Sequence, residues 1–278
     1  GHPLRGVRAE LRRDRHLVDI VVRPLSREDT GQLLDVLLSA PPSPALLDAV
    51  FERTEGLPFF VEELAAALEE GEGLVERSGM LELAADAGLP LPDGVVDAVL
   101  ARTAGLRSSH LDAVELAATL GVQVDLLALA ELAGPDEVDA LLDAGLLVEA
   151  ADVETASFRH ALVRESLYRT IPWARRRDRH RHAAEVLQRR HAPSMVVADH
   201  WVAAHEPRRA RPLLLAAAEQ SCAVHAYRDA ATAARRAIAL WPEDEDTHAR
   251  LATLERLAEC AELSGELGEA VSIWSEVA

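Results

Sequence analysis

The sequence predicts a mainly α-helical protein with a few short strands, in the α+β class. Apolar residues recur at helical spacing along most of the 278 residues, and glycine and proline divide this pattern into short segments. Three short runs, at 17–22, 145–149 and 155–158, instead have the composition of strands. An apolar content of 49% and a charged content of 27% are ordinary for a globular protein.

The first elements predicted are one strand and two helices. Residues 17–22 are rich in β-branched side chains and predict a buried, parallel strand. Ser26 and Asp29 then have the spacing of a capping box, which predicts a helix that runs to about Ala40. A proline-rich break precedes a second helix over about 45–55.

Residues 56–64 form the most informative segment of the chain. Gly56 is suited to the left-handed conformation that ends a helix. Pro58 is suited to the first turn of the next helix, which we expect to end near Gly71, because no amide donor is needed there. An ordinary corner between two helices and a ligand-contacting turn are both consistent with this pattern.

The residues after Pro58 are compatible with a ligand surface at this turn. Phe59 and Phe60 add apolar area, so we expect a rigid shelf on which a flat ligand could rest. Glu62 and Glu63 are expected in the first turns of the helix, where their charge complements its dipole.

A glycine- and proline-rich segment, 72–91, predicts a linker and a domain boundary. Beyond it the pattern predicts short helices, then two strands around a polar turn, then a helix that starts near His160. Small helices followed by a hairpin are typical of a winged-helix domain. The four short helices are expected near 93–104, 108–120, 124–133 and 135–144.

From residue 172 onward the sequence predicts helices only. Segments 208–225 and 227–240 predict a helix pair that stops at Pro242, and a second pair follows. Small and apolar residues in both pairs match the tetratricopeptide pattern in part. The matching positions are Leu214, Ala218, Ala230, Ala237, Pro242, Leu254, Ala258, Gly265, Ala270 and Trp274.

The chain contains no lysine, and all 29 of its basic residues are arginine. A phosphate-binding P-loop and lysine Schiff-base chemistry are therefore excluded for this segment. His191, His200, His205 and His225 lack the spacing and partners of a metal site, so no metal is expected. The two cysteines, Cys222 and Cys260, are expected to be reduced and buried in a cytoplasmic protein, and no apolar run predicts a membrane span or a signal peptide.

The net charge of −18 is unevenly distributed. Residues 28–157 carry 4 arginines and 27 acidic residues, whereas residues 158–215 carry 13 arginines and 5 acidic residues. The overall acidity argues against nonspecific nucleic-acid binding. The dense basic stretch at 175–182 has three interpretations: a nucleic-acid contact, a solvated helix face, or a face docked on the acidic region.

The order of these segments resembles the signal-transduction ATPases with numerous domains (STAND), and within them the large LuxR-type ATP-binding regulators. The resemblance covers nearly the whole chain and divides it into the end of a nucleotide-binding core (1–25), an AAA-type helical lid (26–71), a linker (72–91), a winged helix (92–171) and tetratricopeptide-like repeats (172–278). It is carried by the stretches at 2–5, 23–26, 56–64, 91–92, 117–121 and 158–165.

The resemblance implies a regulatory and sensor segment of an ATP/ADP-switched transcriptional regulator. In the family, the proline of the Gly-x-Pro turn packs against adenine, which corresponds here to Pro58 with Gly56. Related immune receptors carry a Met-His-Asp motif whose histidine reaches the ADP phosphate, and His160 has the corresponding place, although Arg159 and Ala161 replace the Met and Asp. No catalytic residue is expected in this chain.

The same resemblance implies the cofactor and the partners. The P-loop and the Mg²⁺ site of a slow ATPase switch would precede residue 1, so ATP or ADP is not expected to bind tightly to this chain alone. The helical repeats would bind an inducer or a protein partner, and a nucleotide-dependent oligomer is expected. DNA would be bound only by a C-terminal helix-turn-helix beyond residue 278, and no membrane is expected as a partner.

Two alternatives stay open on the sequence. The same module accompanies cyclase and kinase domains in this broad class, in which case the output is enzymatic. The chain is alternatively a helical-repeat scaffold in which Pro58 and His160 are only structural.

Overall fold

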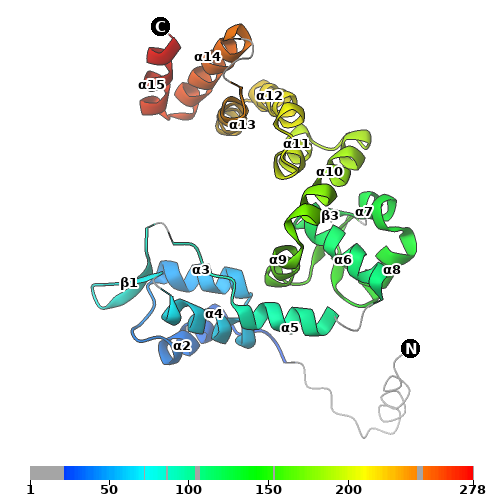
Figure 1. Ribbon diagram of the computed structural model, residues 1–278. Helices are drawn as coiled ribbons and strands as arrows, with labels where there is room; N and C mark the ends of the chain where they lie inside the picture. Colours follow the sequence, from blue (N-terminus) through cyan, green and yellow to red (C-terminus); the bar gives the residue numbers. More distant parts are fainter. Residues whose placement is uncertain are drawn as a thin grey trace, which may run out of the picture. The chain divides into compact units, whose positions relative to one another are not determined.

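The computed structural model describes residues 22–71, 73–85, 87–103, 107–152, 154–242 and 247–277, which contain fourteen helices and five short strands (Figure 1). The predicted mainly α class is therefore confirmed. The chain divides into two compact units, 1–94 and 95–278. The predicted strand at 17–22, apart from Val22, lies outside the described residues, and the finer domain boundaries stay predictions.

The first unit is built from three helices and a β-hairpin around a small apolar core. Leu34, Val50 and Leu64 are fully buried in this core, and Leu68 and Leu81 pack with them. The elements are α2 (Arg27–Leu37), α3 (Pro44–Thr54), α4 (Pro58–Glu70), β1 (Leu74–Arg77) and β2 (Met80–Leu83).

Helix α2 begins with the capping box that the sequence predicts. The Ser26 hydroxyl accepts a hydrogen bond from the Asp29 backbone amide (3.1 Å), and the Asp29 carboxylate accepts one from the Ser26 amide (3.3 Å). Two amide donors that the helix leaves unpaired are satisfied in this way, so the start of α2 is fixed locally.

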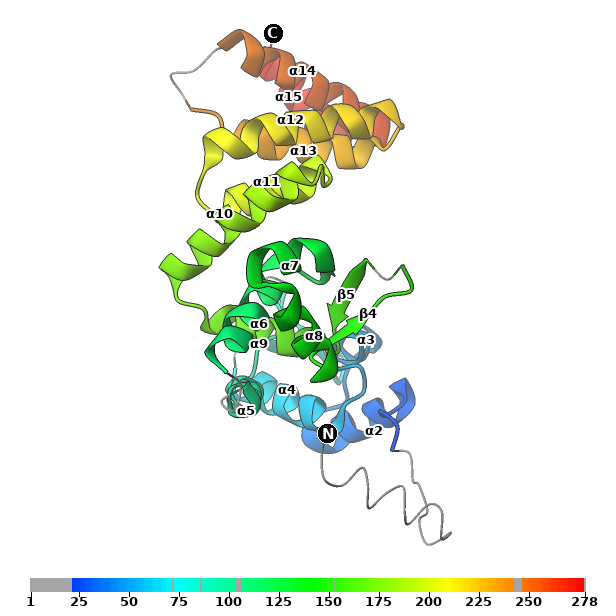
Figure 2. The ribbon, with the colours of Figure 1, turned by 90° about the vertical axis from the view of Figure 1, so that its right-hand side faces the viewer.

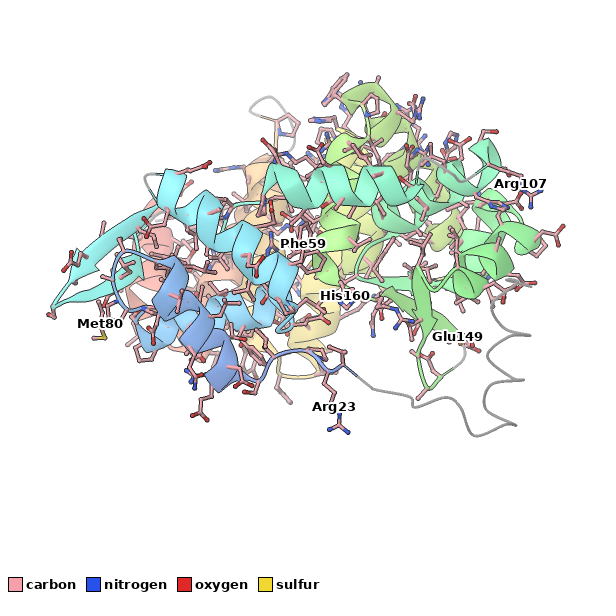
Figure 3. The ribbon with its side chains drawn as sticks, turned by 90° about the horizontal axis from the view of Figure 1, so that it is seen from below. Arg23, Phe59, Met80, Arg107, Glu149 and His160 are labelled. Carbon is pink, nitrogen blue, oxygen red and sulfur yellow. The ribbon has the colours of Figure 1, made fainter. Side chains whose placement is uncertain are left out.

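The segment expected as a linker folds into the hairpin β1–β2. Arg77 pairs with Met80 across its turn, where Met80 is half-exposed (Figure 3). The inner strand is held by the break between α2 and α3, because the Leu81 amide donates to the Pro41 carbonyl (2.8 Å) and the Ser43 amide donates to the Leu81 carbonyl (2.8 Å). This segment therefore belongs structurally to the first unit.

Helix α5 (Asp93–Thr103) crosses the boundary between the two units, because its first two residues belong to the first unit. Four more helices and a three-stranded antiparallel sheet follow it. The predicted strands β4 and β5 pair as expected, with Val148 opposite Ser157. Strand β3 was not predicted, because it directly precedes a helix and two of its three residues, Val124 and Asp125, were included in the helical segment from 124. The elements are α5 (Asp93–Thr103), α6 (Ser108–Leu120), β3 (Gln123–Asp125), α7 (Leu126–Ala133), α8 (Pro135–Asp143), β4 (Leu147–Glu149), β5 (Thr155–Phe158) and α9 (Ala161–Thr170).

The rest of the second unit is helical, as predicted. Helices α11 to α15 each pack against the next one along the chain, and we call them the helix stack (Figures 1 and 2). The contact between α12 and α13 is made largely by alanines, which let the helix backbones approach closely. The elements are α10 (Trp173–Arg189), α11 (Ser194–Ala203), α12 (Pro207–Ala223), α13 (Tyr227–Ala239), α14 (Thr247–Ser264) and α15 (Leu267–Val277).

Five helices of the second unit end in the same hydrogen-bonded turn, the Schellman motif. In α12 the Ala226 amide donates to the Ser221 carbonyl (2.9 Å) and the His225 amide donates to the Cys222 carbonyl (3.0 Å). The residue after the cap has a left-handed backbone in each case, which glycine adopts most easily. These residues are Gly145, His191, His205, His225 and Gly265.

Among the described helices, each is too short or too polar to cross a lipid bilayer.

Candidate functional site

Gly56 lies in a turn that only glycine fits. Its φ is +69°, and a β-carbon at this position would lie 2.1 Å from the Leu25 carbonyl oxygen. The Leu25 amide donates to the Gly56 carbonyl at 2.7 Å, so the chain before α2 is held against the turn between α3 and α4. The predicted left-handed conformation of Gly56 is confirmed, and the contact with Leu25 adds a second reason for this glycine.

Pro58 is the first residue of α4, as predicted, and it is exposed. Phe59 is 44% exposed (Figure 3), whereas Phe60 is only 8% exposed. The two rings are tilted by 52° with their centres 5.7 Å apart. The apolar surface at this turn is therefore made by Pro58 and Phe59, and Phe60 anchors the helix start from inside.

Glu62 and Glu63 lie in the second turn of α4, because the first turn contains no acidic residue. They lie one turn beyond the helix start, where the effect of a charge on the helix dipole is already weaker. The Glu63 carboxylate lies instead against Gly94, where an added β-carbon would meet its Oε2 at 1.8 Å. Gly94 is the second residue of α5, so this negative charge lies near the positive end of another helix.

His160 is the residue that caps α9, between the end of β5 and the first helical residue, Ala161. Its backbone is extended (φ −140°, ψ 133°), its side chain is half-buried, and it makes no side-chain capping bond. Arg159 is exposed, and its Nε donates to the Gly145 carbonyl at 3.4 Å. The predicted position of His160, at a strand end that opens a helix, is confirmed.

The three predicted site residues fall into two groups. Gly56 and Pro58 belong to one turn of the first unit, and His160 belongs to the second unit. The structure therefore shows an exposed apolar turn in one unit and a half-buried imidazole at a helix start in the other.

The basic stretch at 175–182 is largely engaged with the protein itself. Arg179 and Arg175 reach α6, Arg177 donates to the Ala204 carbonyl (2.9 Å), and Arg181 pairs with Asp178 (2.9 Å). Of the three interpretations, docking on the acidic region is the one observed for the arginines that reach α6. Arg189 and Arg190 extend the pattern, because they pair with Glu131 (2.5 Å) and Asp125 (3.3 Å).

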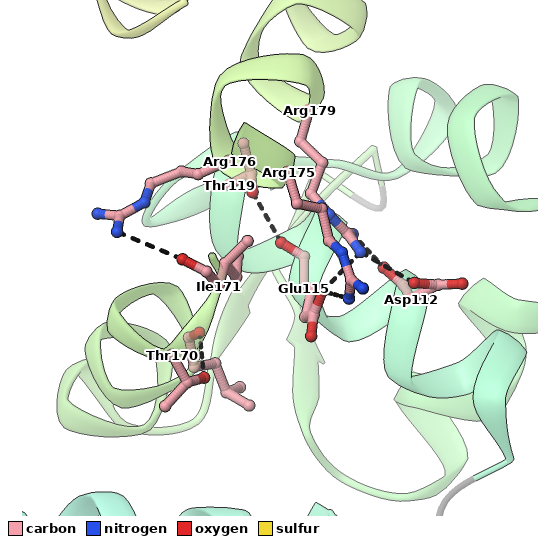
Figure 4. A network of polar contacts seen from close by, with 9 residues as sticks. Asp112, Glu115, Thr119, Thr170, Ile171, Arg175, Arg176 and Arg179 are labelled. Atoms are coloured by element: carbon pink, nitrogen blue, oxygen red, sulfur yellow. Dashed lines mark hydrogen bonds and ion pairs between the residues drawn. The ribbon is translucent and has the colours of Figure 1, made fainter. Parts of the chain in front are cut away.

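Arg179 is the centre of this contact, which we call the charged junction: Arg179 and Arg175 with Asp112 and Glu115 (Figure 4). The Arg179 side chain is 9% exposed, and its Nη2 donates to Glu115 Oε2 (2.5 Å) and to Asp112 Oδ1 (2.9 Å). Its Nη1 donates to the Asp112 carbonyl at 2.8 Å. A guanidinium is suited to this position because it donates in several directions at once.

A second buried polar network, which we call the histidine relay, was not predicted. It joins Tyr168 on α9, His180 on α10 and His200 on α11. The Tyr168 hydroxyl lies 2.8 Å from His180 Nε2, and His180 Nδ1 lies 2.9 Å from His200 Nδ1. His180 and His200 are 7% and 5% exposed, and His200 also bonds to the Leu120 backbone at the end of α6.

One assignment of protons satisfies every member of the relay. Tyr168 donates to His180 Nε2, His180 donates through Nδ1 to His200 Nδ1, and His200 donates through Nε2 to the Leu120 carbonyl. Both imidazoles are neutral in this arrangement. The sequence offered no local signal for the relay, because its members are 12 and 20 residues apart and His180 lies within a run of arginines.

Burial is the main cause that lowers the pKa of both relay histidines from 6.5 to about 4. The neighbouring imidazole and the guanidiniums of Arg164 and Arg176 lower the pKa of His180 further. Asp199 and the bond to Leu120 act in the opposite direction on His200, and Arg164 lowers its pKa. The neutral state of the relay at pH 7 therefore follows from its surroundings.

A cavity of about 580 Å³ lies between α6, α10 and the end of α7. Its apolar floor includes Leu116, Leu132 and Val186, and its rim includes Arg189 and Glu131, which pair with each other. In the described ranges, no three His, Cys, Asp or Glu side chains gather as a metal site would require.

No protein-family model and no curated protein matches this chain, so a function has to be argued from its sequence and structure.

Proposed function

We propose that this chain is the regulatory and sensor segment of an ATP/ADP-switched STAND-type transcriptional regulator in the cytoplasm. In this proposal α2 to α4 form the helical lid, α6 to α9 with the sheet form a winged helix, and the helix stack forms tetratricopeptide-like repeats. The order of these elements along the chain supports it. The P-loop half of the switch would be supplied in cis, because this chain contains no lysine.

The observation that carries the proposal is the turn at Gly56–Pro58. A fixed left-handed glycine, an exposed proline at N1 of α4 and the exposed Phe59 ring next to it form a small apolar surface on a rigid support. Such a surface fits one face of a planar base, since its area is apolar and its backbone is already ordered. Gly56 supports Pro58 through the contact with Leu25 and does not itself need to touch a ligand.

His160 is the proposed second contact of the switch. An imidazole at the N-terminus of α9 is suited to donate to a phosphate oxygen, and the first amides of the helix add positive potential there. The nucleotide supplies the free-energy difference between two states of the switch. A His160 contact made only in the ADP state would hold the winged helix in the inactive position.

The decisive experiment is a titration of the intact reading frame, which includes the nucleotide-binding core, with fluorescent ADP and ATP. Pro58→Ala should lower the affinity for ADP by roughly fivefold, because an apolar contact with the base is lost. Its matched control is Pro44→Ala, since Pro44 is the exposed N1 residue of α3. Equal affinities for both variants would contradict the proposed base contact.

His160→Ala should lower the affinity for ADP by roughly tenfold or more and the affinity for ATP by less, because a hydrogen bond to a charged group is lost in the ADP state only. The basal activity of the regulator should rise as a result. Arg159→Ala is the matched control, since Arg159 is exposed and adjacent. If the intact protein binds no nucleotide at all, the chain is a helical scaffold. If it binds nucleotide and His160→Ala changes nothing, the histidine is structural.

A further inference from the structure

The only two cysteines of the chain lie next to each other in the helix stack. Cys222 lies in the last turn of α12 and is half-buried. Cys260 lies about one helical turn before the last residue of α14 and is buried. Although 38 positions separate them, the two thiols are within hydrogen-bonding reach of each other. Both belong to the same apolar cluster, in which Ala218, Leu257 and Ala258 are buried.

Other contacts fix the same alignment of α12 with α14. Arg256 pairs with Glu219 at 3.9 Å, one helical turn before the two cysteines on each helix. A further turn back, Leu215 and Ala218 line a small cavity together with Ala252. The two helices therefore run in the same direction over about two turns, and the thiol pair is a consequence of this register.

The environments of the two sulfurs differ. Burial, with a smaller contribution from Cys222, raises the pKa of the Cys260 thiol to about 11. Cys260 is therefore protonated at neutral pH and shielded from solvent. Cys222, half-buried at a helix end, is the sulfur that a small oxidant in water reaches first.

We propose that Cys222 and Cys260 form a peroxide-sensitive modification site, at which oxidation creates a disulfide that ties α12 to α14. The Cys222 thiolate attacks one oxygen of hydrogen peroxide, which gives a sulfenic acid and releases hydroxide. The Cys260 sulfur then loses its proton, attacks Cys222 Sγ and displaces the sulfenic oxygen as water. In total, two thiols and one peroxide give one disulfide and two waters.

The expected consequence is a stiffer helix stack. The disulfide would close a loop that contains all of α13, so the unfolded chain would lose much of its freedom. This site does not depend on nucleotide binding, and its test is separate from that of the proposed function.

The test is oxidation of the purified chain with hydrogen peroxide, followed by mass spectrometry and thermal unfolding. We expect an intact mass lower by about 2 Da, one cross-linked peptide that contains both cysteines, and a melting temperature of the helix stack raised by roughly 5–10 °C. Dithiothreitol should reverse all three changes. Before oxidation, iodoacetamide should modify Cys222 in the folded protein and spare Cys260.

Two variants keep the test decisive. Cys222→Ser should fold normally, form no disulfide and show no rise in melting temperature with peroxide. Cys260→Ala should leave Cys222 to stop at the sulfenic acid, which dimedone traps. A folded wild-type protein that gives only higher oxides of Cys222, or only disulfide-linked dimers, would overturn the proposal.

Discussion

Arg179 and His180 are consecutive residues of α10 with buried polar side chains, but one side chain is charged and the other is neutral. Both are 7% exposed and both connect α10 to neighbouring helices. Arg179 keeps its charge and meets the carboxylates of Asp112 and Glu115, whereas His180 stays neutral and passes a hydrogen bond from Tyr168 to His200. The charged junction thus joins α10 directly to Asp112 and Glu115 of α6, and the histidine relay joins α10 through α11 to Leu120 at the end of α6.

The two contacts respond differently to substitution and to acid. A buried charge is tolerated when its partners are close, and removal of one partner leaves the other without compensation. A buried neutral imidazole is tolerated because it gives up its charge, and acid then acts against it. The charged junction is therefore sensitive to substitution, and the histidine relay is sensitive to pH.

The largest effect is expected at Arg179. Arg179→Met should destabilise the protein by about 3 kcal/mol in denaturant unfolding, because Glu115 remains buried with only Arg175 nearby. Glu115→Leu in the same chain should recover most of this loss, since an apolar pair has no charge to desolvate. A double variant as unstable as Arg179→Met would mean that the charge pair itself is strongly stabilising.

Acid should weaken the histidine relay next. The pKa of each relay histidine is lowered from 6.5 to about 4, so the unfolded chain binds more protons between these values. Stability from the relay is complete above pH 6.5 and is lost as the pH falls toward 4. On the order of 2 kcal/mol should be lost between pH 7 and pH 5.

His200→Gln tests this pH dependence directly. Its amide can accept from His180 and donate to Leu120, but it does not titrate. Denaturant unfolding at pH 7, 6 and 5 should give a shallower loss for this variant than for the wild type. His182→Gln is the matched control, because His182 is exposed on the same stretch of α10. Identical slopes for His200→Gln and the wild type would remove the relay as a source of acid sensitivity.

A smaller effect is expected at the start of the relay. Tyr168→Phe removes the donor to His180 and should cost about 1 kcal/mol at pH 7. Tyr227→Phe removes a similar bond to the exposed His225 and should cost less. Thermal unfolding of the two variants measures the difference, and a larger loss for Tyr227→Phe would contradict the importance of burial.

The smallest effect is expected at the rim of the charged junction. Arg175 shares Glu115 with Arg179, but its side chain is 55% exposed and the distance is 3.4 Å. Arg175→Ala should therefore cost about 0.5 kcal/mol, and less in high salt. A loss comparable to that of Arg179→Met would show that the two arginines act as one unit.

Much of the fold follows from local sequence signals. The capping box at Ser26, the proline at N1 of α4 and the strands around residues 150–154 were predicted because neighbouring residues set the backbone there. Strand β3 was not, because its pairing with β5 is a contact between distant residues. The hairpin β1–β2 was not predicted either, because the glycines around it indicated a linker.

The candidate site was predictable to a similar extent. The turn at Gly56 and the helix start at His160 are local features, and the backbone structure of both was predicted correctly. Phe59 is exposed and Phe60 is buried because of the way α4 packs against its neighbours. Two identical consecutive residues give no indication of which one will be buried. The relay and the thiol pair arise from packing of separate helices, so nothing near any one of their residues indicates them.

The repeated Schellman ends give the helix stack a mechanical property. Since α10, α11, α12 and α14 each close their own carbonyl end with local backbone bonds, a helix that detaches leaves the end of its neighbour intact. A pull on the C-terminal end should therefore peel the stack one helix pair at a time, with several small force steps. A bond between Cys222 and Cys260 would merge the steps of α12, α13 and α14 into one larger rupture.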